Sequence, residues 1–222
     1  MKPRFSNQRN HALTITEVLV TVSTLCLLVV VALADSKTGV DKNTEQRVAC
    51  MNNLRLIDLA CRIWSADKGD KYPIHISQKQ GGAMESANLG NVAPIFQVMS
   101  NELTSPKFLV CPADTNRFIA DNFTSGFDNS HISYFVGLDA DITSPQSLVA
   151  GDSNMAIDGV PVKSGLLQLS TDAPVTWTAD RHFNKGVNVG NVILADAIID
   201  IRIPLSKLLV QTGLATNRLA IP

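Results

Sequence analysis

Several acidic and imidazole side chains in the last third of the chain have types that could do catalytic or metal chemistry. They lie between residues 152 and 196: Asp152, Asp158, Asp180, His182 and Asp196. A histidine near carboxylates can act as a general base or ligate a metal. Their spacing matches no histidine-pair zinc helix, aspartate-rich calcium loop or nucleophile elbow. We therefore expect these residues to form turns, and we expect no enzymatic activity and no cofactor.

Glu17 also needs a chemical explanation, because this charged residue lies inside the apolar run from Leu13 to Ala34. A run of about 20 apolar residues has the length of a membrane-spanning helix. A carboxylate in such a helix costs on the order of 3 kcal/mol at mid-bilayer and less near an end. Either the span begins at Val18 and leaves Glu17 among the lipid headgroups, or Glu17 has a charged partner.

The four cysteines divide by position, with Cys26 inside the apolar run and Cys50, Cys61 and Cys111 beyond it. In an oxidising compartment the last three can form one disulfide and leave one free thiol. Cys50 and Cys61 are too far apart to bridge, because their separation on a helix is about 16 Å. Cys111 therefore pairs with one of them or with neither. No cysteine spacing resembles a zinc site.

Composition bounds the kind of protein. The 222 residues carry a formal net charge of −1 and are 45% hydrophobic, so nothing favours a nucleic-acid partner. The part that follows the apolar run is long enough to bury a single core. Lys2, Arg4 and Arg9 precede the run without an acidic residue, which predicts a cytoplasmic N-terminus and a body across the membrane.

The body is predicted to combine helix and strand. Apolar residues recur every three or four positions through residues 44–66, which predicts an amphipathic helix. Trp64 and Trp177 are expected in the core. The rest is expected to form an antiparallel sheet, because short β-prone runs alternate with turn residues. These runs are residues 108–110, 132–138, 147–150, 175–178, 192–195 and 198–203.

The segment ALTITEVLV at residues 12–20 resembles the processing motif of type IV prepilins and type II secretion pseudopilins. The resemblance implies cleavage between Ala12 and Leu13, N-methylation of Leu13, and an assembly role for Glu17. In this motif the leader usually ends in glycine and the mature chain begins with phenylalanine, so Ala12 and Leu13 are departures. The implied organisation is a leader at 1–12, a transmembrane and assembly helix at 13–34, and an exported pilin-like domain at 35–222.

Further blocks are similar to a pilin-like group of planctomycete- and verrucomicrobium-type bacteria with a C-terminal His-to-Asp-Gly signature. These blocks are residues 50–73, 108–115, 133–154 and 177–200. Ala197 replaces the signature glycine, and the spacing from His182 to Asp196 is longer than usual. The resemblance favours a Cys50–Cys111 disulfide, because both cysteines belong to matching blocks. It also raises the prospect of a calcium site in the β-region, without naming ligands.

The resemblance implies a pilin-like α+β fold, in which a long N-terminal helix, membrane-embedded in its first half, packs on an antiparallel sheet. The function implied is that of a structural subunit of a type II secretion or type IV pilus-like complex. Its partners would be a prepilin peptidase, other pilin-like subunits and the inner membrane, with the body periplasmic. Glu17 would then pair with the N-terminal ammonium of a neighbouring subunit.

Two other function classes stay open at this point. The chain could be an anchored or secreted extracytoplasmic binding module, for example for polysaccharide, because Val31–Ala34 resembles a signal-peptidase site. It could also be an exported hydrolase, although the sequence shows no convergent nucleophile or carboxylate pair. The structural subunit is our prediction.

Overall fold

The computed structural model describes residues 14–35, 41–196, 198–201 and 205–222. The chain divides into two compact units, Met1–Val40 and Asp41–Pro222, which are described separately. The predicted leader at 1–12 and both residues of the predicted cleavage site, Ala12 and Leu13, lie outside the described residues.

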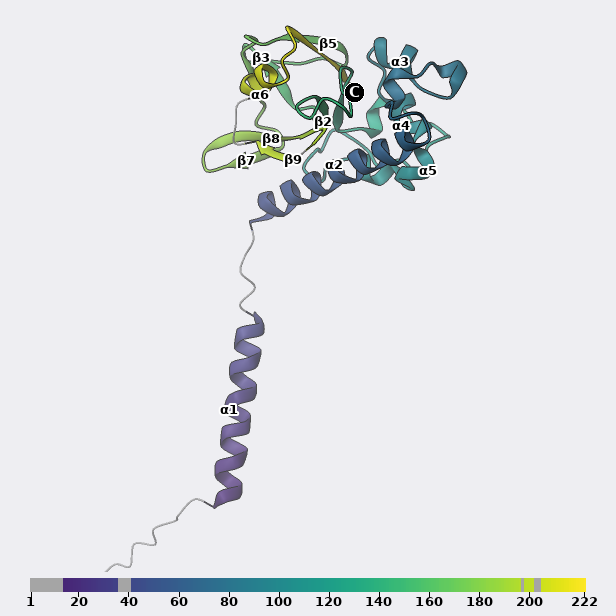
Figure 1. The fold of residues 1–222 in the computed structure, drawn as a ribbon. Coiled ribbons are helices and arrows are strands. Elements are labelled where there is room, and N and C mark those ends of the chain that lie inside the picture. The colour runs from purple at the N-terminus through teal and green to yellow at the C-terminus, as the bar shows by residue number, and fades with distance from the viewer. Residues whose placement is uncertain (1–13, 36–40, 197, 202–204) are drawn as a thin grey trace, which may run out of the picture. The chain divides into compact units, whose positions relative to one another are not determined.

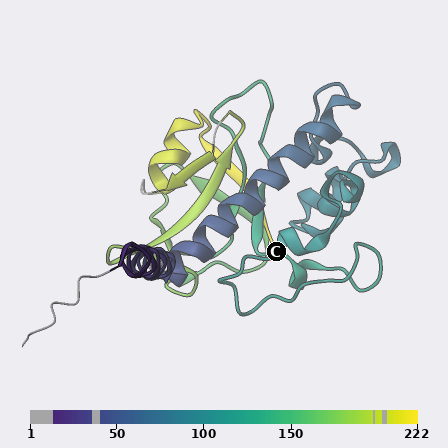
Figure 2. The same cartoon turned by 90° about the horizontal axis from the view of Figure 1, so that it is seen from below.

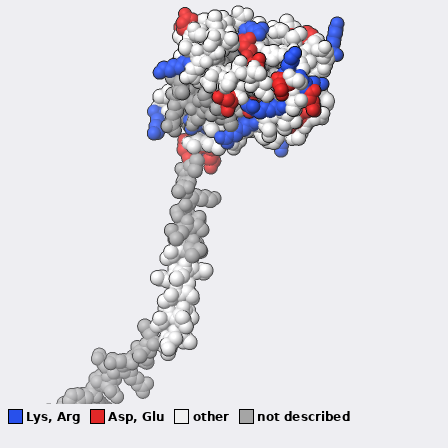
Figure 3. Space-filling view, viewed as in Figure 1, with Lys and Arg blue, Asp and Glu red and all other residues white. Residues whose placement is uncertain are grey.

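The first unit contains α1, which covers Ile15–Asp35 (Figure 1). The side chains of residues 14–29 are all exposed, and Glu17 carries the only charge among them. The face of this stretch drawn in Figure 3 is white, whereas basic and acidic side chains are interspersed on the body. Within the described ranges, no helix is both long enough and apolar enough to cross a membrane.

The second unit begins with α2, Lys42–Ala66, which confirms the predicted amphipathic helix. Its buried residues are Cys50, Leu54, Ile57, Ala60, Cys61, Trp64 and Ser65. These positions lie three or four residues apart and so share one face of a helix. Val48, predicted on the same stripe, is 45% exposed. In Figure 2, α2 has the teal helical segment on one side and the green and yellow strands on the other.

Short helices follow α2 along the chain. They are η1 (Pro73–His75), η2 (Gln78–Gln80), α3 (Met84–Asn88), α4 (Ala93–Val98), α5 (Ser100–Leu103), η3 (Pro106–Leu109) and η4 (Asn129–His131). The predicted strand at 108–110 is wrong, because residues 106–109 belong to η3. Ser105 accepts a hydrogen bond from the Lys107 backbone, and Pro106 fixes φ at the first position, so local capping overrides the β-prone side chains.

The remaining strands form two antiparallel sheets. The larger sheet contains β1 (Tyr134–Gly137), β2 (Leu148–Asp152), β5 (Gly165–Ser170), β7 (His182–Asn184), β8 (Val187–Leu194), β9 (Ile198–Ile201) and β10 (Thr216–Ile221). Its order is β5-β10-β1-β2-β8-β7, and β9 also pairs with β8. The smaller sheet has the order β4 (Val160–Pro161), β3 (Met155–Ile157) and β6 (Val175–Trp177). One further helix, α6, covers Leu205–Gln211.

The larger sheet separates two hydrophobic cores. Tyr134 of β1 and Ile193 of β8 belong to the core that contains the buried residues of α2. Their strand neighbours Phe135 and Val192 belong to the other core, with Trp177 of the smaller sheet. Successive residues of a strand point to opposite faces, so the central strands are apolar at consecutive positions. The fold is therefore α+β with antiparallel sheets, as predicted.

Candidate functional site

A buried cluster joins four segments that are distant in sequence. Cys50 of α2 forms a disulfide with Cys111, which follows η3. His182 at the start of β7 places Nε2 3.3 Å from Cys111 Sγ and 3.7 Å from Asp152 Oδ2, at the end of β2. All four side chains belong to residues with 0% exposure. The disulfide confirms the pairing that the family resemblance favoured.

The strand order places the two polar members of the cluster side by side. β8 lies between β2 and β7, and His182 pairs with Val189 of β8. Asp152 Oδ2 accepts hydrogen bonds from the Asn191 backbone N–H at 2.7 Å and from its side-chain amide at 2.9 Å. Asn191 is itself 0% exposed, and its two hydrogen bonds hold the carboxylate in position.

Burial dominates the protonation of both residues. It raises the pKa of the Asp152 carboxyl to about 6, against the opposing effects of Arg181 and the Asn191 hydrogen bonds. Burial also lowers the pKa of His182 to about 4, and the positive charges of Arg181 and Arg47 act in the same direction. At neutral pH the cluster therefore holds a carboxylate and a neutral imidazole. Among the described atoms, Asp152 Oδ1 and His182 Nδ1 have no hydrogen-bond partner.

The chemistry open to this cluster depends on the state of the sulfurs. In the disulfide neither sulfur is a nucleophile, and no member of the cluster faces solvent, so the arrangement does not support turnover of a substrate. One atom from each of Cys50, Cys111, Asp152 and His182 lies within 4.8 Å of the others, and these are the atoms that could hold a metal.

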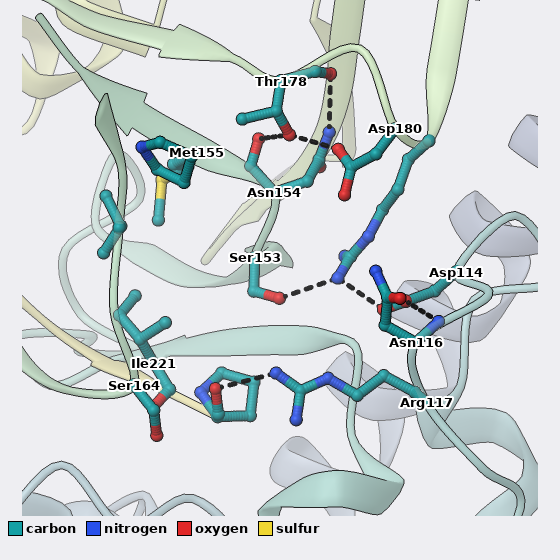
Figure 4. Close-up of a pocket in the computed structure, with 14 residues that line it drawn as sticks. Asp114, Asn116, Arg117, Ser153, Asn154, Met155, Ser164, Thr178, Asp180 and Ile221 are labelled. Carbon is teal, nitrogen blue, oxygen red and sulfur yellow. Dashed lines mark hydrogen bonds and ion pairs between the residues drawn. The ribbon is translucent and has the colours of Figure 1, made fainter. Parts of the chain in front are cut away.

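A second feature is an open pocket of about 460 Å³ between the ends of several strands and the loop that follows η3 (Figure 4). Thr178 and Asn154 lie at one end of the pocket and Arg117 at the other (Figure 4). Arg117 donates to the carbonyl oxygens of Asn129 at 2.7 Å and Pro222 at 2.9 Å. Burial lowers the pKa of its guanidinium, against the attraction of Asp114.

Arg181 also lines the pocket, and its side chain is almost completely buried. Its guanidinium pairs with the Asp114 carboxylate and donates to the Ser133 carbonyl at 2.6 Å and to Ser153 Oγ at 3.1 Å. Asp114 in turn accepts a hydrogen bond from Ser133 Oγ at 2.9 Å. Within the described part of the chain, Arg181 Nε and Asn154 Oδ1 lack a hydrogen-bond partner although both atoms are buried. Both residues line the pocket, but these two atoms are buried beneath its surface.

The residues singled out in the sequence are distributed over different places. Asp152 and His182 meet in the buried cluster, and Asp180 lines the pocket, where it accepts a hydrogen bond from Thr178 Oγ1. Asp158 is exposed in the β3–β4 turn with φ of 49°, as expected of a turn residue. Asp196 is exposed and accepts a 3.5 Å hydrogen bond from Gln146. Sequence reasoning missed Asp114 and Arg181, whose pairing depends on tertiary contacts.

Both tryptophans lie where the sequence predicts them. Trp64 is 7% exposed and Trp177 is 8% exposed, and each belongs to one of the two cores. The Trp177 indole Nε1 has no hydrogen-bond partner among the described atoms. A role for either ring on an exposed ligand-binding face is therefore not supported.

Glu17 takes part in a local structure at the start of α1. Its carboxylate accepts hydrogen bonds from the Thr14 backbone N–H at 2.9 Å and from Thr14 Oγ1 at 3.0 Å. The Glu17 backbone N–H donates back to Thr14 Oγ1 at 3.4 Å. This reciprocal pattern is a capping box, which satisfies backbone donors that a helix start leaves free. The sequence carries its signature as Thr-x-x-Glu at residues 14–17.

Comparison with known proteins gives no match: no family model, no curated protein and no solved structure matches this chain.

Proposed function

We propose that this chain is a pilin-like structural subunit that is processed before Leu13 and assembles through its apolar N-terminal helix. The complex would be of the type II secretion or type IV pilus kind. The subunit would sit in the inner membrane with a cytoplasmic N-terminus and a periplasmic body. A prepilin peptidase and other pilin-like subunits would be its partners.

The observation that carries this proposal is the surface of α1. Apolar side chains such as Leu19, Leu25 and Leu28 are more than 60% exposed in the isolated chain. Apolar side chains lie on every side of this helix, so no single face accounts for their burial. An exposed apolar surface of this extent marks a site of association with protein or lipid. Packing against copies of the same helix would bury all of it.

The capping box at Glu17 sharpens the assembly test, because it gives the glutamate a local role as well as the proposed intersubunit one. Glutamine can also serve at the fourth position of a capping box. Glu17→Gln therefore removes the charge and keeps the cap, whereas Thr14→Val removes the cap and keeps the charge. If Glu17 pairs with a neighbouring ammonium, only Glu17→Gln should strongly reduce crosslinking between subunits in native membranes.

Thr14→Val is the matched control for that experiment. Loss of an N-cap costs about 1 kcal/mol of helix stability, which a long packed helix tolerates. Equal crosslinking of Glu17→Gln and wild-type subunits would contradict the charge-pairing role. Loss of crosslinking in Thr14→Val alone would assign Glu17 to capping.

Processing is tested by the mass of the chain isolated from its own membrane. The proposal predicts a mature protein that begins at N-methylated Leu13 and retains α1. A signal peptidase acting near Ala34 would instead release a body without α1. A mature start near Asp35 would overturn the proposal, and an intact Met1 would show that the peptidase rejects Ala12 and Leu13.

The pocket supports a second candidate function, an extracytoplasmic module that binds an acidic polysaccharide. A uronic-acid unit would supply a carboxylate for Arg117, which lines the pocket. Calorimetric titration with oligogalacturonate tests this candidate. We expect binding that Arg117→Ala weakens about tenfold, from the loss of one charge-assisted hydrogen bond. Arg55→Ala on the exposed surface of α2 is the control, and equal effects of both variants would exclude this pocket.

A further inference from the structure

The buried cluster of Cys50, Cys111, Asp152 and His182 contains two polar side chains that a disulfide does not require. A disulfide between α2 and the segment after η3 requires only two sulfurs. The structure nevertheless buries a carboxylate and an imidazole completely beside them, at 0% exposure each. Burial of a carboxylate is unfavourable unless it is paired or coordinates a metal.

The hydrogen bonds of the cluster also leave polar atoms without partners. His182 Nε2 faces both Cys111 Sγ and Asp152 Oδ2, at 3.3 and 3.7 Å, but a thiol or disulfide sulfur is a weak hydrogen-bond partner. On the described residues, Asp152 Oδ1 and His182 Nδ1 have no partner at all. Each of these two fully buried side chains thus approaches its neighbours through one polar atom, Nε2 or Oδ2, and leaves its other polar atom without a hydrogen-bond partner.

We propose that the reduced form of Cys50 and Cys111, together with His182 and Asp152, is a tetrahedral Zn²⁺ site that replaces the disulfide as the link between α2 and the sheet. Thiolate, imidazole and carboxylate are the ligand types that zinc prefers, and structural zinc sites are four-coordinate and closed to solvent. The site needs no substrate position, since all four residues are buried. This inference does not depend on the proposed function.

Formation of the site follows from a balanced exchange. Two thiols of a dithiol reductant break the Cys50–Cys111 bond, are themselves oxidised to a disulfide, and leave two cysteine thiols. Zn²⁺ then displaces one proton from each thiol to solvent as two Zn–S bonds form, because the thiolate is the ligand. His182 would bind through a ring nitrogen as a neutral imidazole, the form in which histidine ligates metals.

The observed spacing is compatible with this coordination. Zn–S bonds of about 2.3 Å and Zn–N or Zn–O bonds of about 2.0–2.2 Å place tetrahedral ligand atoms roughly 3.3–3.8 Å apart. The four candidate atoms already lie within 4.8 Å of one another, so rotations of the freed cysteine side chains and small shifts of the others suffice.

The surroundings of the ligands also suit a metal. Asn191 donates twice to Asp152 Oδ2 and so fixes the orientation of the carboxylate, as outer-shell residues do in zinc sites. Two thiolates and a carboxylate around Zn²⁺ leave one net negative charge.

The test uses the full-length chain carrying Cys26→Ser and Cys61→Ser, so that Cys50 and Cys111 are its remaining cysteines. The protein is reduced with a phosphine, freed of reductant under anaerobic conditions and titrated with Co²⁺. We expect one equivalent to bind with the visible absorption of tetrahedral cobalt and with thiolate-to-cobalt charge transfer. Zn²⁺ should then displace the cobalt. The oxidised protein should show neither signal.

His182→Gln and Asp152→Asn test whether these side chains are ligands. Each should weaken Zn²⁺ binding about 100-fold or more, measured by competition with a chromophoric chelator. Asp158→Asn, which alters an exposed carboxylate in the β3–β4 turn, should leave affinity unchanged. Circular dichroism of each variant in the oxidised state separates loss of ligation from loss of folding, because the disulfide then holds the fold without metal.

If the reduced protein is folded but shows no tetrahedral cobalt spectrum, the proposal is wrong. Undiminished affinity in a variant that lacks both His182 and Asp152 would also overturn it, because two thiolates alone would then explain the binding.

Discussion

Arg181 forms a buried ion pair and buried hydrogen bonds beside the pocket. Its side chain is 5% exposed and that of Asp114 is 2% exposed, so the ion pair between them is almost completely withdrawn from water. The guanidinium also holds the Ser133 carbonyl and Ser153 Oγ, which belong to the segments flanking β1 and β2. A buried charge that loses its partner cannot recover its hydration.

Arg181→Met should therefore lower the free energy of unfolding by about 3–5 kcal/mol, because the Asp114 carboxylate stays buried without its partner. Urea denaturation followed by circular dichroism measures this loss. The double variant Arg181→Met with Asp114→Asn should recover a part of it, since no buried charge remains. A loss below about 1 kcal/mol in the single variant would show that water reaches the carboxylate.

Cys61 illustrates how burial suppresses reactivity at a single atom. The residue is 7% exposed, and burial, aided by the nearby Asp58 carboxylate, raises the pKa of its thiol to about 12. Cys26 is also free, but it is exposed. Alkylation with iodoacetamide at pH 8 should label Cys61 only on unfolding, because the thiolate is the reactive form. Rapid labelling of Cys61 in native protein would contradict its buried position.

Among the elements, α2 contributes its apolar face to one of the two hydrophobic cores. Leu54 is 0% exposed in this core, whereas Val48, on the same helix, is 45% exposed. The two positions differ in burial but not in secondary structure. Packing rather than helix propensity should therefore decide the effect of truncating them.

Leu54→Ala should reduce the free energy of unfolding by about 2–5 kcal/mol through the cavity it leaves. Val48→Ala, on the exposed part of the helix, should change it by about 0.5 kcal/mol or less. Thermal or urea unfolding of the two variants in parallel provides the measurement. Similar losses at both positions would mean that Val48 is covered in the folded protein.

The smaller sheet packs on the larger one through a close approach at Gly190. A Cβ atom added at Gly190 of β8 would lie 2.4–2.5 Å from atoms of the Trp177 ring. Gly190→Ala should therefore destabilise the protein by about 1–3 kcal/mol through overpacking. Trp177→Leu removes the ring, so Gly190→Ala should cost less in the Trp177→Leu protein than in the wild-type protein. A double-mutant cycle measures this difference. Additive effects would contradict this contact.

How far the sequence predicts the elements depends on how local their causes are. The α2 stripe repeats every three to four residues and predicts the helix almost to its ends, residues 44–66 against Lys42–Ala66. The run at residues 108–110 misleads because Ser105 and Pro106 determine a helical turn there. The strands β5 and β10 are not predicted, since their pairing partners lie far away in the chain.

The candidate site is less predictable than the fold for the same reason. Cys50, Cys111, Asp152 and His182 meet only because α2 packs on a sheet in which β8 separates β2 from β7. No spacing along the chain encodes that order. The capping box, in contrast, could have been predicted from Thr14 and Glu17 alone, because its four-residue pattern is local.

At the scale of the whole molecule, the second unit contains both hydrophobic cores. Every residue of the two buried clusters lies between Cys50 and Ile221, and the described side chains of α1 are exposed. Since folding is driven by burial of apolar surface, this unit should not require the first one.

A chain that begins at Asp41 should thus fold on its own, with the Cys50–Cys111 disulfide formed and a cooperative unfolding transition. Its denaturation midpoint should agree with that of the full-length protein, and its slope should be similar because both bury the same surface. Broad, non-cooperative unfolding of the shorter chain would show that residues before Asp41 complete its structure.

The position of the disulfide also determines how the body would respond to a pulling force. Cys50 lies near the beginning of α2, and its partner Cys111 is 61 residues further along the chain. Tension applied at the N-terminal side would pass from Cys50 directly to Cys111, so the residues between them would bear no load. The molecule would extend by roughly 200 Å less on forced unfolding than its length implies, since each shielded residue contributes at most about 3.3–3.6 Å. Reduction of this single bond would restore the missing extension.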